Sequence, residues 1–226
     1  MKKFIVISTF LLSILFQKSS AQIQMGIEAG PLWSNMNIKG DGNLIKNTHD
    51  YTGIKAGVSI TKNWENGVGV ESGLYYSKTG FMVRQDFGFD VYNIPISTGL
   101  TAIPTFQYME LPVLLNYKIG NEKVKLNLSA GPYAAYAMSG EIQTKAHVIF
   151  DFNTGTYDLN MNSSLFNRWE AGLMAKAGIQ IPLGRINLNL NGQFQQGLND
   201  LSDEPILDIK TKRYAFGAGA GISLAF

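Results

Sequence analysis

Apolar and polar side chains alternate with a period of two through most of the chain. Successive side chains of a β-strand point to opposite faces, so this alternation predicts strands with one apolar and one polar face. The pattern is clearest in residues 185–198, where Ile186, Leu188 and Leu190 alternate with asparagines. Eight segments follow the rule, namely residues 24–30, 54–61, 68–76, 109–118, 123–130, 169–181, 185–198 and 214–226.

The connections between these segments alternate in length. Short connections are expected at residues 62–66, 120–122 and 182–184, and long ones at residues 35–50, 79–104, 139–165 and 199–209. Short turns at one end and long loops at the other are typical of outer-membrane barrels. The sequence therefore predicts an all-β fold, an eight-stranded antiparallel up-and-down transmembrane β-barrel, with both chain ends on the periplasmic, short-turn side.

The polar faces of the predicted strands carry charges of both signs. Many ions in a soluble core would be costly to desolvate, whereas inside a narrow barrel they can pair with each other and with trapped water. We therefore predict a polar network in the lumen, formed by Glu28, Lys55, Glu71, Glu110, Lys118, Lys125, Glu170, Lys176 and Arg213. An eight-stranded barrel is just wide enough for its side chains to fill, so a wide pore is not expected.

A soluble barrel is the alternative reading of the same alternation. In a secreted, lipocalin-like ligand binder the apolar faces would point inward and the charged faces outward, and periodicity alone does not separate the two cases. Strand length favours the membrane, because a tilted spanning strand needs about 9 to 11 residues and a soluble strand averages about 5 to 6.

The two ends of the chain also suggest export. Residues 1–21 combine a basic start, an apolar run too short to span a membrane, and small residues before Gln22, which predicts a cleaved signal peptide. Residues 22–226 then form the barrel domain. The terminal Phe226 closes an amphipathic segment, and it is the aromatic end that the barrel-assembly machinery commonly recognises. There is no cysteine, which excludes disulfides and thiolate metal sites.

Several segments are similar to a known family. They are GIEAG at residues 26–30, YMELPVLLNYK at 108–118, LSAGPY at 128–133 and GAGAGI at 217–222. They resemble the outer-membrane β-barrel domain proteins of Bacteroidetes, a group that includes PorT-like proteins and small barrels of the OmpA and OmpX kind. The resemblance implies an outer-membrane location and an eight-stranded barrel, and it links PorT-like members to a protein secretion system.

No pattern in the sequence indicates catalysis, a cofactor or a metal. His49 and His147 fall in predicted outer loops without ligand spacing, and Ile149 stands where a lipid deacylase would carry its serine. There is no nucleophile elbow, P-loop or dinucleotide fingerprint. The loop acids could bridge to lipopolysaccharide through divalent ions, but their spacing matches no calcium motif. We expect a non-enzymatic protein without cofactor.

We expect a structural role or a role in binding partners. The long outer loops at residues 79–104 and 139–165 are candidate contacts for protein partners, and the apolar faces suit membrane lipid and lipopolysaccharide. No nucleic-acid platform is present, since the apparent basicity of the chain lies largely in Lys2, Lys3 and Lys18 of the predicted signal peptide. The alternatives are a narrow transport or secretion-system component and the soluble ligand binder.

Overall fold

The strands of the protein are long and almost continuous along the chain. The computed structural model describes residues 22–39, 48–91, 94–147, 151–159, 161, 167–200 and 210–226. The predicted signal peptide at residues 1–21 lies outside these described residues. The strands are β1 (Gln22–Lys39), β2 (Thr48–Asn63), β3 (Val68–Val91), β4 (Ile94–Gly120), β5 (Lys125–His147), β6 (Asp151–Asp158), β7 (Trp169–Leu183), β8 (Ile186–Gly197) and β9 (Lys210–Ala225).

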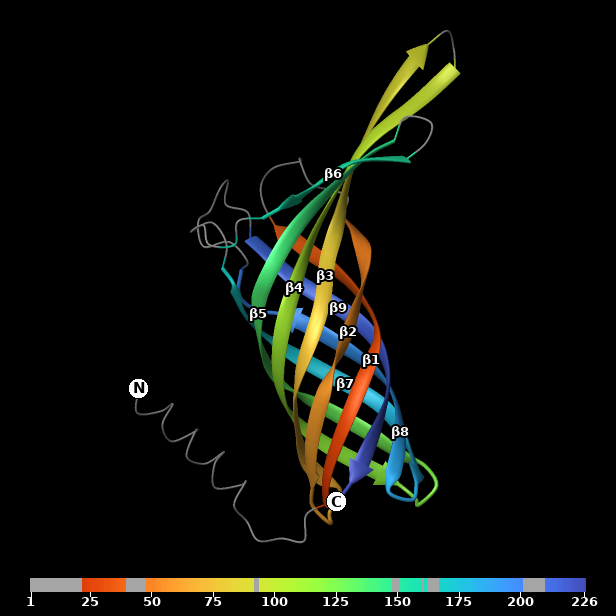
Figure 1. Cartoon of the computed structure of the whole chain (residues 1–226), viewed down its shortest axis with the longest axis vertical. Coiled ribbons are helices and arrows are strands. Elements are labelled where there is room, and N and C mark those ends of the chain that lie inside the picture. The colour runs from red at the N-terminus through yellow and green to blue at the C-terminus, as the bar shows by residue number, and fades with distance from the viewer. Residues whose placement is uncertain are drawn as a thin grey trace, which may run out of the picture.

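Eight of these strands close into a barrel (Figure 1). Each pairs antiparallel with the next along the chain, and β5 pairs directly with β7. The first and last strands then pair with each other, from Gln24 opposite Ala225 to Lys39 opposite Lys210. In a closed antiparallel barrel, the backbone N–H and C=O groups of every strand form hydrogen bonds with the neighbouring strands. The predicted eight-stranded up-and-down barrel is confirmed.

The short turns lie at the end of the barrel where the described chain begins and ends. Between β2 and β3 the amide of Trp64 donates to the carbonyl of Val68 at 2.8 Å, and Gly67 has a φ of 82°. Between β7 and β8 the turn contains Gly184 with a φ of 70°. Positive φ is cheap for glycine and costly for other residues, so these glycines permit tight reversals. In the part of the chain that the structure describes, no helix is long and apolar enough to cross a membrane.

The two faces of the wall have opposite chemistry. On the outside, Leu190 exposes 56% of its surface and Ile179 exposes 46%. On the inside, Lys55 exposes 4% and Glu110 is fully buried. A soluble barrel would place these residues the other way round. The described strands therefore have the apolar-out, polar-in faces predicted from the alternation, and the faces required by the lipocalin-like alternative are absent from them.

Two predicted loops are largely strand, so that part of the prediction is wrong. Residues 79–104 form the upper parts of β3 and β4, which stay paired up to Val91 opposite Ile94. Residues 139–165 contain the upper part of β5 and the additional strand β6, which pairs with it. Strand pairing continues there because each strand finds a partner beyond the barrel rim, whereas the prediction ended strands near the length that a bilayer requires.

An apolar cluster lies inside the barrel towards this extended end. Phe106, Tyr108 and Met161 belong to it, together with Leu114, Tyr133, Ala135, Ala137 and Met174. Leu159 packs against the cluster, and its amide donates to the carbonyl of Gly140 at 2.8 Å. The short segment after β6 therefore contributes side chains to the interior. The cluster overlaps the polar residues along the axis, because Leu114 lies nearer the short turns than Glu110 on β4, and Met174 lies nearer them than Glu170 on β7.

Candidate functional site

The most buried charge in the lumen is the carboxylate of Glu110, on β4. It forms an ion pair with Lys55 at 3.0 Å and accepts hydrogen bonds from Ser77 at 2.6 Å and from the amide of Gln195 at 2.9 Å. Arg213 approaches the same carboxylate at 3.5 Å. Four strands thus provide the partners of one buried anion, which is the arrangement that a buried charge needs.

Arg213, on β9, joins this carboxylate to a second one. Its Nε lies 3.1 Å and 3.0 Å from the two oxygens of Glu170, and a terminal nitrogen lies 2.7 Å from Oε1. The hydroxyl of Tyr133 donates to the same Glu170 oxygen at 2.5 Å. The guanidinium also lies over the ring of Tyr108, 4.9 Å from its centroid. We call Lys55, Glu110, Glu170 and Arg213 the upper ion cluster.

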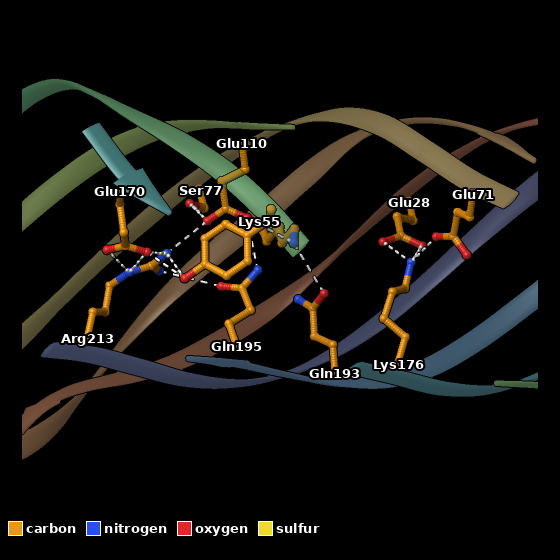
Figure 2. A network of polar contacts seen from close by, with 11 residues as sticks. Glu28, Lys55, Glu71, Ser77, Glu110, Glu170, Lys176, Gln193, Gln195 and Arg213 are labelled. Carbon is orange, nitrogen blue, oxygen red and sulfur yellow. Dashed lines mark hydrogen bonds and ion pairs between the residues drawn. The ribbon is translucent and has the colours of Figure 1, made fainter. Parts of the chain in front are cut away.

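A second group of ions lies nearer the short turns (Figure 2). Lys176 pairs with Glu28 at 3.1 Å and with Glu71 at 2.8 Å. Asn191 donates to Glu28 at 3.1 Å, and Ser129 donates to Glu71 at 3.1 Å. We call Lys176, Glu28 and Glu71 the lower ion cluster.

A tyrosine lies between the two clusters. The ring of Tyr75 is 4.6 Å from the ammonium of Lys55 and 5.7 Å from that of Lys176. Glycines make room for it, because a Cβ on Gly57 would lie 2.5 Å from the ring and one on Gly73 would lie 2.7 Å from it. The lumen is thus filled by aromatic rings as well as by ions.

The last two predicted lumen residues, Lys118 and Lys125, form no ion pair with either cluster, although Lys118 lines the same cavity as the lower ion cluster. Lys118 donates to the amide oxygen of Gln24 at 2.6 Å, and Gln180 donates to the same oxygen at 3.3 Å. Lys125 lines the mouth of the barrel at the short turns. The structure therefore brings seven of the nine predicted residues into two ion clusters and places the two lysines at the mouth.

Some members of the network were not named from the sequence. They include Ser77, Tyr75, Tyr133, Gln193 and Gln195. A signal did exist, because each follows the same period-two register as the predicted ions and lies on the polar face. The predicted network contains only charged residues, so the neutral donors and acceptors on the same polar face are not part of it.

The arrangement is suited to holding the wall together rather than to chemistry. Each ion of the two clusters has an opposite charge within reach, and a cavity of about 50 Å³ beside the lower ion cluster has room for a few water molecules. Within the described residues, no group of three His, Asp or Glu side chains could hold a metal. His49 is exposed at the start of β2, and the side chain of His147 lies outside the described residues.

The terminal Phe226 follows β9 at the short-turn end. Its amide donates to the carbonyl of Ile23 at 2.9 Å, and its side chain is 73% exposed. The residue thus continues the pairing of β9 with β1 and presents its ring on the outer surface.

Solved barrels resemble the chain at low sequence identity. Neisserial surface protein A is 12% identical, covers 90% of this chain and 97% of its own, and has a TM-score of 0.42. OprG from Pseudomonas aeruginosa is 17% identical over 93% and 97% of the two chains, with a TM-score of 0.42. Ail, the attachment invasion locus protein of Yersinia pestis, is 19% identical over 89% and 98%, with a TM-score of 0.37.

No curated protein matches the chain significantly. The family model described as "Outer membrane protein beta-barrel domain" matches residues 16–203, which is most of the chain. The match agrees with the closed wall, the apolar outer surface and the charged lumen described above. The chain belongs to the outer membrane protein beta-barrel domain family.

Proposed function

We propose that the protein is a non-enzymatic outer-membrane barrel that presents a binding platform for other proteins at its extended end. The observation that carries the proposal is the continuation of β3 and β4 beyond the other strands, paired as far as Val91 and Ile94 (Figure 1). In the family this end is expected to face the outside of the cell, because the short turns of such barrels lie in the periplasm.

The extended end offers a specific way of binding. β3, β4, β5 and β6 are paired there in one antiparallel sheet, and among the described strands β6 pairs only with β5. A strand at a sheet edge has backbone groups that a strand of another protein can pair with. A partner protein would therefore recognise the backbone of this edge, with side chains of the sheet providing selectivity.

Site-specific crosslinking tests the platform. A photoreactive amino acid is introduced at Asp90 in the β3–β4 extension, and the matched control carries it at Leu190 on the lipid-facing wall. We expect protein adducts from position 90 and none from position 190 when cells are irradiated. A surface-exposed barrel without adducts at position 90, or equal adducts at both positions, would contradict the proposal.

Orientation is tested with single cysteines, since the chain has none of its own. We expect Asp90→Cys to react with an impermeant maleimide on intact cells, and Glu65→Cys, in the β2–β3 turn, only after the outer membrane is permeabilised. The reverse pattern would place the extended sheet in the periplasm and contradict a platform facing the cell exterior.

Further parts of the proposal follow from the sequence. We assign the chain to the Bacteroidetes members of the family, residues 1–21 to a cleaved signal peptide, and Phe226 to recognition by the barrel-assembly machinery. Membrane lipid and lipopolysaccharide are the proposed surroundings of the apolar wall. A PorT-like conduit in secretion is less well supported than a platform, because the lumen is occupied by the two ion clusters and Tyr75.

A further inference from the structure

The mouth of the barrel at the short turns is hollow. A cavity of about 340 Å³ is bordered there by the β2–β3 turn, the end of β4 and the starts of β1 and β5. Lys118, Lys125 and Asn63 line it, together with Gln24, Trp64 and Glu65. Its walls are more polar than apolar, so an occupant would be held by charges and hydrogen bonds.

Two cations in this cavity form no ion pair within the described part of the chain, and Glu71 attracts Lys118 only from beyond ion-pair distance. Lys118 has the neutral amide oxygen of Gln24 as its acceptor, and neither Lys118 nor Lys125 forms an ion pair with any carboxylate among the described residues. The other lysines of the lumen, Lys55 and Lys176, each pair with a glutamate. The lysines at the mouth are therefore the exceptions to the pairing rule that the rest of the lumen follows.

A buried amide in the same cavity is also without a partner. Asn63 is 8% exposed, and neither its amide nitrogen nor its amide oxygen makes a hydrogen bond. A buried donor left unsatisfied is costly, and such groups usually find a ligand or water. The unused amide donor and the two ammonium groups line one cavity, so they can act on one ligand.

We propose that this mouth binds a small oxyanion, such as a carboxylate or phosphate group, between Lys118 and Lys125 with Asn63 as a hydrogen-bond donor. Glu65 also lines the cavity, so two lysines and one acid give its lining a net positive charge. The ligand stops at the mouth, because beyond Lys118 and Gln24 lies the cavity lined by Glu28 and Glu71. These two carboxylates already share Lys176 and would repel a second anion.

Tryptophan fluorescence offers a direct test, because Trp64 lines the cavity. Trp33 and Trp169, the other two tryptophans, are exposed on the outer wall and can be changed to Phe, which leaves Trp64 as the reporter. The folded barrel in detergent is titrated with inorganic phosphate and, separately, with succinate at constant ionic strength. We expect a saturable change with at least one of them, and the stronger response identifies which oxyanion group is preferred.

Matched variants assign the binding to the mouth. Lys118→Gln and Lys125→Gln should each weaken binding by about threefold to tenfold, since an ion pair that is open to solvent contributes only modestly to binding. Lys123→Gln removes the same charge from the neighbouring turn outside the cavity and should leave binding unchanged. Heat-modifiable gel migration verifies that each variant is folded.

Two results would overturn the proposal. One is the absence of a saturable response of the parent barrel to both phosphate and succinate. The other is an equal loss of binding in Lys123→Gln, which would mean that general surface charge and not the mouth attracts the anion. Neither result depends on the platform at the opposite end of the barrel.

Discussion

At the scale of single residues, the lumen is governed by the cost of isolating a charge. Glu170 illustrates this, because it is almost fully buried and receives three contacts from Arg213 and one from Tyr133. Removing one member of such a group leaves its partner desolvated without compensation, which costs more than the pair itself contributes. The partly exposed pair of Lys78 and Glu141, 3.8 Å apart, carries a much smaller penalty.

The buried pair of Arg213 and Glu170 and the more exposed pair of Lys78 and Glu141 should differ in their contribution to stability. Glu170→Ala should lower the free energy of unfolding by about 3 kcal/mol, whereas Glu141→Ala should lower it by less than about 1 kcal/mol. Denaturant unfolding of the barrel in lipid vesicles measures both. Replacing Arg213 by Met in the Glu170→Ala background should recover part of the loss, because the stranded cation is then removed. Equal effects of the two single substitutions would refute this account of the lumen.

At the scale of one strand, the wall has a polar inner face and an apolar outer face. In β8 the outward residues Leu188 and Leu190 alternate with the inward residues Asn187 and Asn189. Trp169 of β7 lies opposite Tyr136 of β5, near the rim away from the short turns, and their ring centroids are 4.9 Å apart. Aromatic rings at the rim and aliphatic side chains between the rims are the distribution that a membrane interface favours.

The position of an introduced charge along the outer face of β8 should therefore determine how much it destabilises the barrel. Leu190 is near the middle of the strand and Leu198 directly follows its end, and both are at least half exposed. Leu190→Arg should destabilise the barrel in lipid by about 2–4 kcal/mol, and Leu198→Arg by about 1 kcal/mol or less. The same unfolding measurement applies. If both substitutions were neutral, the outer wall would face water and not lipid.

At the scale of the whole molecule, the barrel is closed laterally by hydrogen bonds and occupied along its axis by side chains. The upper ion cluster, Tyr75 and the lower ion cluster follow one another towards the mouth, and tyrosines of the apolar cluster pack against the upper ion cluster. The cavity beside the lower ion cluster, away from the mouth, has a volume of about 50 Å³. We therefore expect a barrel that does not conduct small solutes.

Reconstituted protein should accordingly fail to pass small sugars. In a liposome swelling assay we expect no arabinose uptake above that of protein-free vesicles, while a general porin measured in parallel allows rapid swelling. The physical reason is that no sugar fits a hollow with room for a few water molecules. Swelling at a porin-like rate would show that the lumen opens and would favour the transport alternative.

Much of this architecture could be predicted because a strand repeats every two residues. That period alone predicts Leu188 outside and Glu110 inside, and closure follows from the need to pair every strand edge. The contacts within the lumen could not be predicted. The neighbours of Glu110 come from four strands, so which lysine meets which glutamate depends on register and stagger, which alternation does not contain. The extended pairing of β3 with β4 was missed because the prediction assumed strands of bilayer length.

The pairing of β1 with β9 has a consequence for biogenesis. The barrel is closed by pairing β1 with β9, so a nascent polypeptide cannot close it until the residues of β9 have been synthesised. Until then two strand edges remain exposed, and open edges invite aggregation. Closure must therefore wait until β9 has been made, and a product truncated before β9 would be degraded by proteases rather than form a weakened barrel.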